Sequence, residues 1–287
     1  MKYVTLDDLN QTIRKNLYKI PHDIDFVIGV PRSGMLVATI ISEFINVPLI
    51  DINSFVSGQK PSGGNRLTLL NRSETGKVLV VDDTCYSGAS MKQAKELLKD
   101  FKNQFIYCVA FLEGKGESEV DIYLDDVKKY TIDSQIPIVL YEWNLMHHYP
   151  FISQRCLYDI DGVLCVDPGD ERNTQEYEKY IQNAIPLYVP SVPIGGFITY
   201  RLEKYREVTE KWLKDNGVRY THLVMFQANN WDERNQSGIS PSVFKGMIYK
   251  NSAAFILFIE SDDRQAQEIH RISGKPVLSI EKNILYE

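Results

Sequence analysis

The chain reads VLVVDDTCYSGAS over residues 78–90. Its first four residues are apolar and predict a short buried strand, with Asp82 and Asp83 at its carboxyl end. A turn containing Gly88 follows, and apolar residues at helical spacing predict a helix over Ala89–Phe101. A strand, a tight turn and a helix start together form an anion site, because the free N–H groups and the dipole of the first helical turn attract negative charge.

The side chains of this turn suit a sugar phosphate. Ser87 and Ser90 can donate hydroxyl hydrogen bonds to a phosphate, and a carboxylate can accept from both hydroxyls of a vicinal diol. One turn could therefore hold a phosphate on the helix and a diol on Asp82 and Asp83. The alternative is an ordinary strand-to-helix turn with two solvated acids.

This stretch resembles the phosphoribosyl-diphosphate (PRPP) signature of the type I phosphoribosyltransferases, with the hydrophobic run, the acidic pair and the small-residue loop in the family's order. The resemblance implies an α/β domain that transfers a 5-phosphoribosyl group from PRPP, with Asp82 and Asp83 as catalytic residues. The residues that it implies for PRPP binding in this turn are Thr84, Tyr86, Ser87, Gly88, Ala89 and Ser90.

A second strand–loop–helix pattern precedes the acidic pair. The predicted strand Phe26–Val30 leads through a Pro-Arg-Ser-Gly loop into a predicted helix over Met35–Phe44. In the family the matching loop holds the pyrophosphate of PRPP through backbone N–H groups. The resemblance therefore implies Arg32, Ser33 and Gly34 as further PRPP-binding residues, although this loop taken alone is a common turn.

The segment Ser57–Arg66 is polar, Gly-rich and basic, which is typical of a mobile loop. Its place between the two phosphate turns resembles the family's flexible lid. The resemblance implies that Lys60 and Arg66 close over the diphosphate and exclude water from a reactive cation. A solvated hairpin is the alternative interpretation, and the sequence supports the lid and the hairpin equally.

The rest of this half alternates helices and strands. A helix is predicted over Leu6–Leu17, and strands over Pro48–Ile52, Phe105–Leu112 and Ile136–Leu140. Such alternation favours a parallel sheet with helices on both faces and ligands at the carboxyl ends of the strands. Trp143 follows the last strand and could stack on an acceptor there, but a core position is at least as well supported.

One departure from the family pattern bears on the acceptor. The 6-oxopurine enzymes carry an Asp four residues after the first acid of the pair, and this chain has Tyr86 there. The Lys that those enzymes carry after the next strand is also missing, and Glu113 lies near its place. Hypoxanthine and guanine are therefore not expected as acceptors.

Length and composition indicate a globular chain of two domains. The chain has 287 residues and a net charge of −6, which gives no general attraction to nucleic acid or anionic membrane. No apolar run reaches the length of a membrane span, and Met1–Arg14 lacks the apolar core of a signal peptide. The four cysteines form no CxxC pair, so we expect a reduced, cytoplasmic protein.

A new pattern begins after Tyr149, which predicts domains over 1–150 and 151–287. An apolar strand runs into Asp159-Ile160-Asp161-Gly162-Val163, which resembles the first motif of the haloacid-dehalogenase (HAD) phosphatases. The two carboxylates of this motif can divide the work, so that one attacks phosphorus while the other handles the proton of the leaving group. The resemblance implies Asp159 as nucleophile and Asp161 as general acid and base.

Further HAD motifs follow in the family's order. Thr199 ends a predicted strand and matches the second motif, which hydrogen-bonds the phosphoryl group, and Lys245 matches the third, with Lys250 as the reserve. The predicted strand Phe255–Ile259 ends in the acidic residues of the fourth motif, which helps to hold Mg²⁺. The residues implied as metal ligands are Asp159, Asp161, Glu260, Asp262 and Asp263.

The expected fold class is α/β, with two domains that each contain a mostly parallel sheet flanked by helices. The first has the type I phosphoribosyltransferase fold and the second a Rossmann-like HAD fold. Two stretches that could form a cap domain are too short to fold as a full one, namely Cys165–Pro193 and Gln227–Pro241. The site should therefore be open and could accept a phosphate group that is attached to a large molecule.

The order of the two expected reactions narrows the range of possible functions. Transfer from PRPP followed by hydrolysis of the phosphate ester gives a product with a ribose that lacks its 5-phosphate. Nucleotide salvage keeps this phosphate, so the two reactions together fit salvage poorly. The whole chain resembles the bacterial two-domain enzymes that add 5-phosphoribofuranose to a glycan and then dephosphorylate it. The alternatives are the synthesis of a nucleoside-like metabolite and a PRPP-sensing regulator, although no basic nucleic-acid-binding domain is evident. A homo-oligomer is compatible with the sequence.

Overall fold

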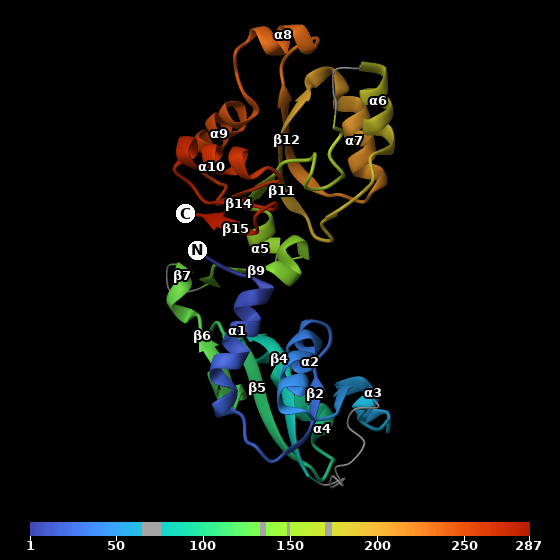
Figure 1. The fold of residues 1–287 in the computed structure, drawn as a ribbon, viewed down its shortest axis with the longest axis vertical. Coiled ribbons are helices and arrows are strands. Elements are labelled where there is room, and N and C mark those ends of the chain that lie inside the picture. The colour runs from blue at the N-terminus through green and yellow to red at the C-terminus, as the bar shows by residue number, and fades with distance from the viewer. Residues whose placement is uncertain (65–75, 133–135, 148–149, 170–173) are drawn as a thin grey trace. The chain divides into compact units, whose positions relative to one another are not determined.

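The computed structural model describes residues 1–64, 76–132, 136–147, 150–169 and 174–287 (Figure 1). The chain divides into two compact units, which we call the N-terminal unit (Lys2–Trp143) and the C-terminal unit (Asn144–Glu287, with Met1). The division falls a few residues before the boundary predicted at residue 150. None of the helices within the described ranges is long and apolar enough to cross a membrane.

The N-terminal unit contains a five-stranded sheet in the order β3-β2-β4-β5-β6, with every neighbouring pair parallel. Parallel neighbours need crossover connections, which the helices supply. The strands are β2 (Ile24–Gly29), β3 (Leu49–Asp51), β4 (Lys77–Cys85), β5 (Gln104–Leu112) and β6 (Ile122–Asp126). The helices are α1 (Leu6–Asn16), α2 (Ser33–Ile45), α3 (Ile52–Val56) and α4 (Ala89–Leu98).

The apolar run at the start of β4 is buried on both faces of this sheet. Leu79 and Val81 belong to the core cluster formed with α1 and α2, whereas Val78 and Val80 belong to the cluster that includes residues of α3 and α4. This alternation follows from the pleat, which directs successive side chains to opposite faces. A central strand covered on both sides therefore carries the acidic pair.

The predicted strand Ile136–Leu140 is wrong as a single element. Residues there form β8 (Ile136–Pro137), antiparallel to β7 (Thr131–Ile132), and β9 (Val139–Tyr141), parallel to β1 (Lys2–Val4). Proline has no backbone N–H for a ladder, so Pro137 favours such an interruption. As a result, β9 pairs with the first residues of the chain in a separate two-stranded sheet.

The C-terminal unit contains a six-stranded sheet in the order β12-β11-β10-β13-β14-β15, in which only the β14–β15 pair is antiparallel. The strands are β10 (Cys156–Tyr158), β11 (Ile194–Leu202), β12 (Tyr220–Phe226), β13 (Leu257–Glu260), β14 (Val277–Ser279) and β15 (Ile284–Tyr286). The helices are α5 (Pro150–Ser153), α6 (Thr174–Asn183), α7 (Arg206–Asp215), α8 (Trp231–Gln236), α9 (Pro241–Asn251) and α10 (Asp263–Ser273).

The strand order places a switch point at β10. The chain moves from β10 to β11 and β12 on one side and then returns to β13 on the other side. Connections diverge at such a point and leave a crevice at the carboxyl ends of the strands, where ligands bind in open α/β sheets. Within the described residues, the two predicted insertions each contribute one helix, α6 and α8.

Candidate active sites

The acidic pair of the N-terminal unit lies within β4, which continues through both residues to Cys85. Asp82 and Asp83 are 8% and 7% exposed. The Ser90 hydroxyl donates to Oδ2 of Asp82 at 2.6 Å, and Nε1 of Trp143 donates to Oδ2 of Asp83 at 2.8 Å. Burial raises the pKa of Asp82, and the charge of Asp83 adds to this rise. Two carboxylates held in this way can accept hydrogen bonds from hydroxyl groups and can stabilise a positive charge that develops nearby.

The turn after the pair has the geometry of an anion site. Gly88 precedes α4 with φ 79°, and a Cβ there would lie 2.5 Å from Cγ of Glu119, so the turn requires glycine for its conformation and for its packing. The N-cap Gly88 has no side chain to cap α4, and the N–H of Ala89 makes a long hydrogen bond of 3.4 Å to the Ser87 hydroxyl. Ser87 and Ser90 are exposed beside these helical N–H groups. This arrangement can offer backbone donors and the Ser87 hydroxyl to a phosphate, whereas the Ser90 hydroxyl proton is already donated to Asp82.

The predicted pyrophosphate loop lies directly beside the acidic pair. The N–H of Val30 donates to the carbonyl of Val81 at 2.9 Å. Gly34 is buried at the start of α2, and a Cβ there would lie 2.8 Å from Oδ1 of Asp82. Arg32 precedes the helix and is exposed. Two strand–loop–helix turns thus meet at one edge of the sheet.

Gly34→Ala is expected to damage this first site selectively. The added methyl would meet the Val81 carbonyl at 2.7 Å as well as Asp82, which are fixed parts of a central strand. Such overpacking destabilises by about 1–3 kcal/mol and would displace the acidic pair. Pyrophosphate release from PRPP should fall, whereas hydrolysis of a small phosphate ester by the C-terminal unit should continue. Equal loss of both activities, or of neither, would contradict the expectation.

Of the two predicted lid cations, Lys60 lies elsewhere and Arg66 lies outside the described residues. Lys60 lines a cavity with Asp25, Pro48 and Asn103, which lie at or just before the starts of β2, β3 and β5. This is the amino-terminal edge of the sheet, opposite the acidic pair. The prediction that Lys60 belongs to the PRPP site is therefore wrong for this structure. After α3 the chain turns back along β3, where Ser62 pairs with Leu49, and this path keeps Lys60 away from the acidic pair.

Trp143 has a role different from the predicted stacking on an acceptor. Its indole packs on the core near Phe111 and Tyr141, and its N–H orients Asp83. The neighbouring Tyr141 hydroxyl donates to Oε1 of Glu113 at 2.5 Å. Glu113 follows β5, and its N–H bonds to the carbonyl of Cys85 at 2.9 Å. The sequence analysis named Glu113 only as a departure from the family pattern. In the structure, Glu113 lies at the same edge of the sheet as Asp82 and Asp83.

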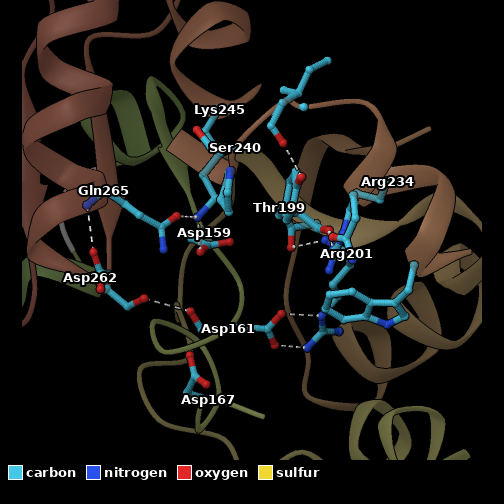
Figure 2. Close-up of a pocket in the computed structure, with 17 residues that line it drawn as sticks. Asp159, Asp161, Asp167, Thr199, Arg201, Arg234, Ser240, Lys245, Asp262 and Gln265 are labelled. Atoms are coloured by element: carbon cyan, nitrogen blue, oxygen red, sulfur yellow. Dashed lines mark hydrogen bonds and ion pairs between the residues drawn. The ribbon is translucent and has the colours of Figure 1, made fainter. Parts of the chain in front are cut away.

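The C-terminal unit has a cavity of about 600 Å³ at the switch point (Figure 2). Asp159 directly follows β10 and is 6% exposed. Lys245 on α9 donates to Oδ2 of Asp159 at 2.5 Å and to Oε2 of Glu260 at 2.7 Å. Burial opposes the charge of this ammonium, but both carboxylates raise the pKa of Lys245, so it is held as a cation. Asp159, Lys245 and Glu260 form a compact buried charge cluster.

Thr199 also lines this cavity, but it lies inside a strand instead of ending one. β11 continues to Leu202, and Thr199 is fully buried. The longer strand brings in Arg201, which sequence reasoning missed. The side chain of Arg201 is buried and lies in the same cavity, on the side opposite Gln265 in Figure 2.

Arg201 holds Asp161 as an ionised carboxylate. Its Nε and Nη2 donate to Oδ2 and Oδ1 of Asp161 at 3.0 and 2.5 Å, and the Tyr180 hydroxyl donates to Oδ1 at 2.8 Å. Burial alone would raise the pKa of Asp161, but the guanidinium lowers it below its usual value. An ionised carboxylate can accept a proton from water but has none to give. The geometry therefore supports the predicted base role and not the predicted acid role.

The predicted metal ligands separate into two groups. Asp159, Asp161 and Asp262 line the cavity. The carboxylate of Asp161 is occupied by Arg201, and fully buried Glu260 binds Lys245 and the N–H of Ser261. Asp263 lies outside the cavity lining, where its carboxylate accepts from Tyr286 and Gln267 at 2.7 and 2.8 Å. The predictions for Glu260 and Asp263 are therefore corrected, because neither residue lines the cavity. The prediction for Asp161 is corrected because both of its carboxylate oxygens accept hydrogen bonds from Arg201.

Comparison with known proteins concerns the N-terminal unit. Residues 5–144 match the sequence model of the family described as "Phosphoribosyl transferase domain". The chain is also 27% identical over 158 residues to the "Bifunctional protein PyrR" of Acetivibrio thermocellus, a match that covers 50% of this chain and 77% of that protein. Residues 5–144 form a type I phosphoribosyltransferase domain. This assignment supports phosphoribosyl transfer, with PRPP as the substrate, in general terms.

Two solved structures resemble the same part of the fold. The purine phosphoribosyltransferase of Pyrococcus horikoshii has a TM-score of 0.33 and 18% identity, and it covers 50% of this chain and 92% of its own. The xanthine-guanine-hypoxanthine phosphoribosyltransferase of Helicobacter pylori has a TM-score of 0.35 and 15% identity, with the same two coverages.

Proposed function

We propose that the chain is a bifunctional enzyme that transfers 5-phosphoribosyl from PRPP to a glycan acceptor and then hydrolyses the 5-phosphate to leave ribofuranose. The observation that supports it best is the presence, in one chain, of a phosphoribosyltransferase domain and a second unit whose switch point carries Asp159, Thr199 and Lys245. The second unit is a HAD-type phosphatase in this proposal, and the two sites act in sequence on one sugar.

In the transfer step, the bond from C1 of the ribose to pyrophosphate breaks and leaves positive charge on the sugar ring. Asp82 and Asp83 hold the diol and stabilise that charge, and Ser90 and Trp143 keep the two carboxylates in place. The first turn of α4 holds the 5-phosphate, and the loop before α2 holds the pyrophosphate. The acceptor oxygen then forms the new bond to C1.

Glu113 supports an acceptor that reacts through a hydroxyl group. A hydroxyl loses its proton as it attacks C1, so a nearby base must take that proton. Glu113 follows β5 next to the acidic pair, with Tyr141 fixing one of its oxygens. Burial raises its pKa to about 7; the hydrogen bond from Tyr141 opposes this rise and the charge of Asp83 adds to it. A base with this pKa is matched to neutral conditions.

Glu113→Gln is expected to lower phosphoribosyl transfer by about 10²-fold at neutral pH, the usual contribution of a general base. The base acts when deprotonated, so the rate of the native enzyme should rise with pH and level off above about 7. This rise should become smaller in the variant, because glutamine does not titrate, whereas Asp82, whose pKa burial also raises to about 7, still does. Initial rates of pyrophosphate release from pH 5.5 to 8.5 measure both effects, and an unchanged pH profile in the variant would exclude the base role.

In the hydrolysis step, the Asp159 carboxylate attacks phosphorus, the bond to the 5-oxygen of the sugar breaks, and an aspartyl-phosphate forms. The departing 5-oxygen takes its proton from solvent in the open cavity. Thr199 and Lys245 hold the phosphoryl oxygens and neutralise their charge. Asp161, held ionised by Arg201, accepts a proton from the water that attacks the aspartyl-phosphate. That attack releases phosphate and restores Asp159.

The donor set of this cavity fits Mg²⁺. Proteins bind Mg²⁺ through one or two carboxylates together with water and substrate phosphate, and Asp159 and Asp262 both face the cavity. When bound, the ion would reduce the repulsion between the carboxylate and the phosphate.

Phosphorus NMR of the full chain with PRPP, Mg²⁺ and candidate acceptors tests the proposal. It resolves pyrophosphate, phosphate ester and free phosphate in one experiment. A glycan acceptor should give pyrophosphate first and free phosphate after it. Efficient nucleotide formation from hypoxanthine or guanine would instead contradict the glycan acceptor, and pyrophosphate without any free phosphate would contradict the second step.

A further inference from the structure

The cavity of the C-terminal unit contains a hydrogen-bond donor that the hydrolysis step leaves unused. Gln265 lies in the first turn of α10, is half-buried and lines the cavity together with Asp159 and Lys245. Its side-chain oxygen, Oε1, accepts a hydrogen bond from Nζ of Lys245 at 3.1 Å. The Lys245 ammonium carries only donors, so the oxygen of the amide must face it, and not the nitrogen. The orientation of the Gln265 amide is therefore fixed by its partner.

The nitrogen of this amide, Nε2, is its free end. Within the described residues Nε2 of Gln265 forms no hydrogen bond, and it is not one of the enclosed side-chain atoms that lack a partner, so it is open to the cavity. Figure 2 shows the amide oxygen on the bond to Lys245 and the amide nitrogen directed into the cavity. An amide nitrogen carries two N–H donors and no acceptor. The ligand that fits beside it therefore carries acceptor oxygens.

The ammonium of Lys245 has no proton left for such a ligand. Its three N–H groups match three acceptors, which are Asp159, Glu260 and Gln265 at 2.5, 2.7 and 3.1 Å. Lys245 can donate to a phosphoryl oxygen only by releasing one of these partners, although its positive charge attracts the anion in any case. The N–H groups of Gln265, in contrast, are available before the ligand arrives.

Gln265 is held in place at both ends. Its backbone N–H donates to Oδ1 of Asp262, the N-cap of α10, at 2.8 Å, and Lys245 holds its Oε1. Because Lys245 also binds Asp159, only one ammonium and one amide group separate Nε2 from the carboxylate that attacks phosphorus. A donor that is already in place loses little conformational entropy when it binds a ligand.

We infer that Gln265 is a phosphoryl-binding residue, whose Nε2 donates a hydrogen bond to a non-bridging oxygen of the phosphate that lies against Asp159. The inference rests on the proposed phosphatase function and adds a binding residue to it. The contact is made to the phosphate and not to the group that leaves, so it serves every phosphate ester alike. Lys245 then supplies the positive charge and Gln265 a neutral donor to the same anion.

Gln265→Met tests this role, because methionine keeps the length of the side chain and removes both polar atoms. The KM for ribose 5-phosphate and the KM for phenyl phosphate should rise by the same factor, about tenfold or more, the value of one hydrogen bond to a charged group. Gln267→Met is the matched control, since Gln267 is exposed on the same helix, donates to Asp263 at 2.8 Å and does not line the cavity. A rise for only one ester, or for neither, would overturn the inference.

Gln265→Glu separates the donor from the contact with Lys245. Glutamate keeps an acceptor oxygen for Lys245 but has no N–H, so the KM for both esters should rise at least as far as in the methionine variant. A native KM in the glutamate variant would mean that Gln265 acts only through Lys245, and the inference would then be wrong.

A crystal structure of the native chain with inorganic phosphate tests the contact independently of hydrolysis. If the native protein hydrolyses neither ester, the proposed phosphatase fails, and this structure decides the inference alone. Phosphate in the cavity with one of its oxygens about 2.7–3.2 Å from Nε2 supports the inference. Phosphate that lies beyond hydrogen-bond distance of Nε2, or a cavity that takes up no phosphate, overturns it.

Discussion

Replacing Asp159 by Asn is expected to stop phosphate release, by about 10³-fold or more, while pyrophosphate release from PRPP continues. The amide lacks the nucleophilic carboxylate but has nearly the same shape. The buried cluster of Asp159, Glu260 and Lys245 loses one negative charge, and Lys245 keeps Glu260 as a partner at 2.7 Å. The fold should therefore survive, and the acceptor should accumulate with an added phosphoribosyl group where the native enzyme adds ribosyl.

Mass spectrometry of the acceptor measures this difference directly. Asp215→Asn is the matched control, because this exposed acid on α7 forms an ion pair with Lys211 on the surface of the helix. A plain ribosyl product from the Asp159 variant would exclude Asp159 as the nucleophile. If neither protein modifies a glycan but both sites act on small molecules, the polysaccharide part of the proposal fails and a nucleoside-like product takes its place.

The double variant Asp82→Asn, Asp83→Asn is expected to lose pyrophosphate release by about 10²-fold or more, because preorganised charge contributes several kcal/mol to a transition state. Its stability should be maintained or raised. Burial raises the pKa of Asp82, so the ionised carboxylate costs free energy in the folded state once the pH exceeds the pKa of the unfolded chain. The amides remove that cost, and loss of activity cannot then be ascribed to unfolding.

Hydrolysis of ribose 5-phosphate by the same variant serves as the internal control and should be unchanged. The matched double variant Glu96→Gln, Asp100→Asn alters two exposed acids at the end of α4 and should keep both activities. Melting temperatures should agree with those of the native protein within a few degrees or exceed them. Undiminished pyrophosphate release in the Asp82, Asp83 variant would refute the role of the acidic pair.

Sequence by itself determined where the acidic pair and the two phosphate turns lie, because these are local features. The apolar run 78–81 is buried on both faces as its composition predicts, and Gly88 has the positive φ that a turn before α4 requires. The family match over residues 5–144 agrees with this part of the prediction. In the second unit, the strand ending before Asp159 was also predictable from its apolar run.

Only the tertiary structure decided which charged side chains meet. Arg201 lies two residues after Thr199 on a strand longer than the apolar pattern indicated, and its pairing with Asp161 depends on how β11 lies beside β10. Lys60 looked like a lid residue, but the pairing of Leu49 with Ser62 carries it to the other edge of the sheet. Asp263 differs from Asp262 by one position, yet its partners are Tyr286 and Gln267.

The physical reason is the range of the interactions. Hydrophobic periodicity and turn chemistry act between residues a few positions apart, so one sequence reports them directly. An ion pair or a hydrogen bond between side chains distant in the chain depends on strand order and register, where a shift of one residue changes the face on which a side chain lies. Sequence therefore predicted many of the side chains that lie at the two candidate sites, whereas the fold assigned each buried carboxylate its partner.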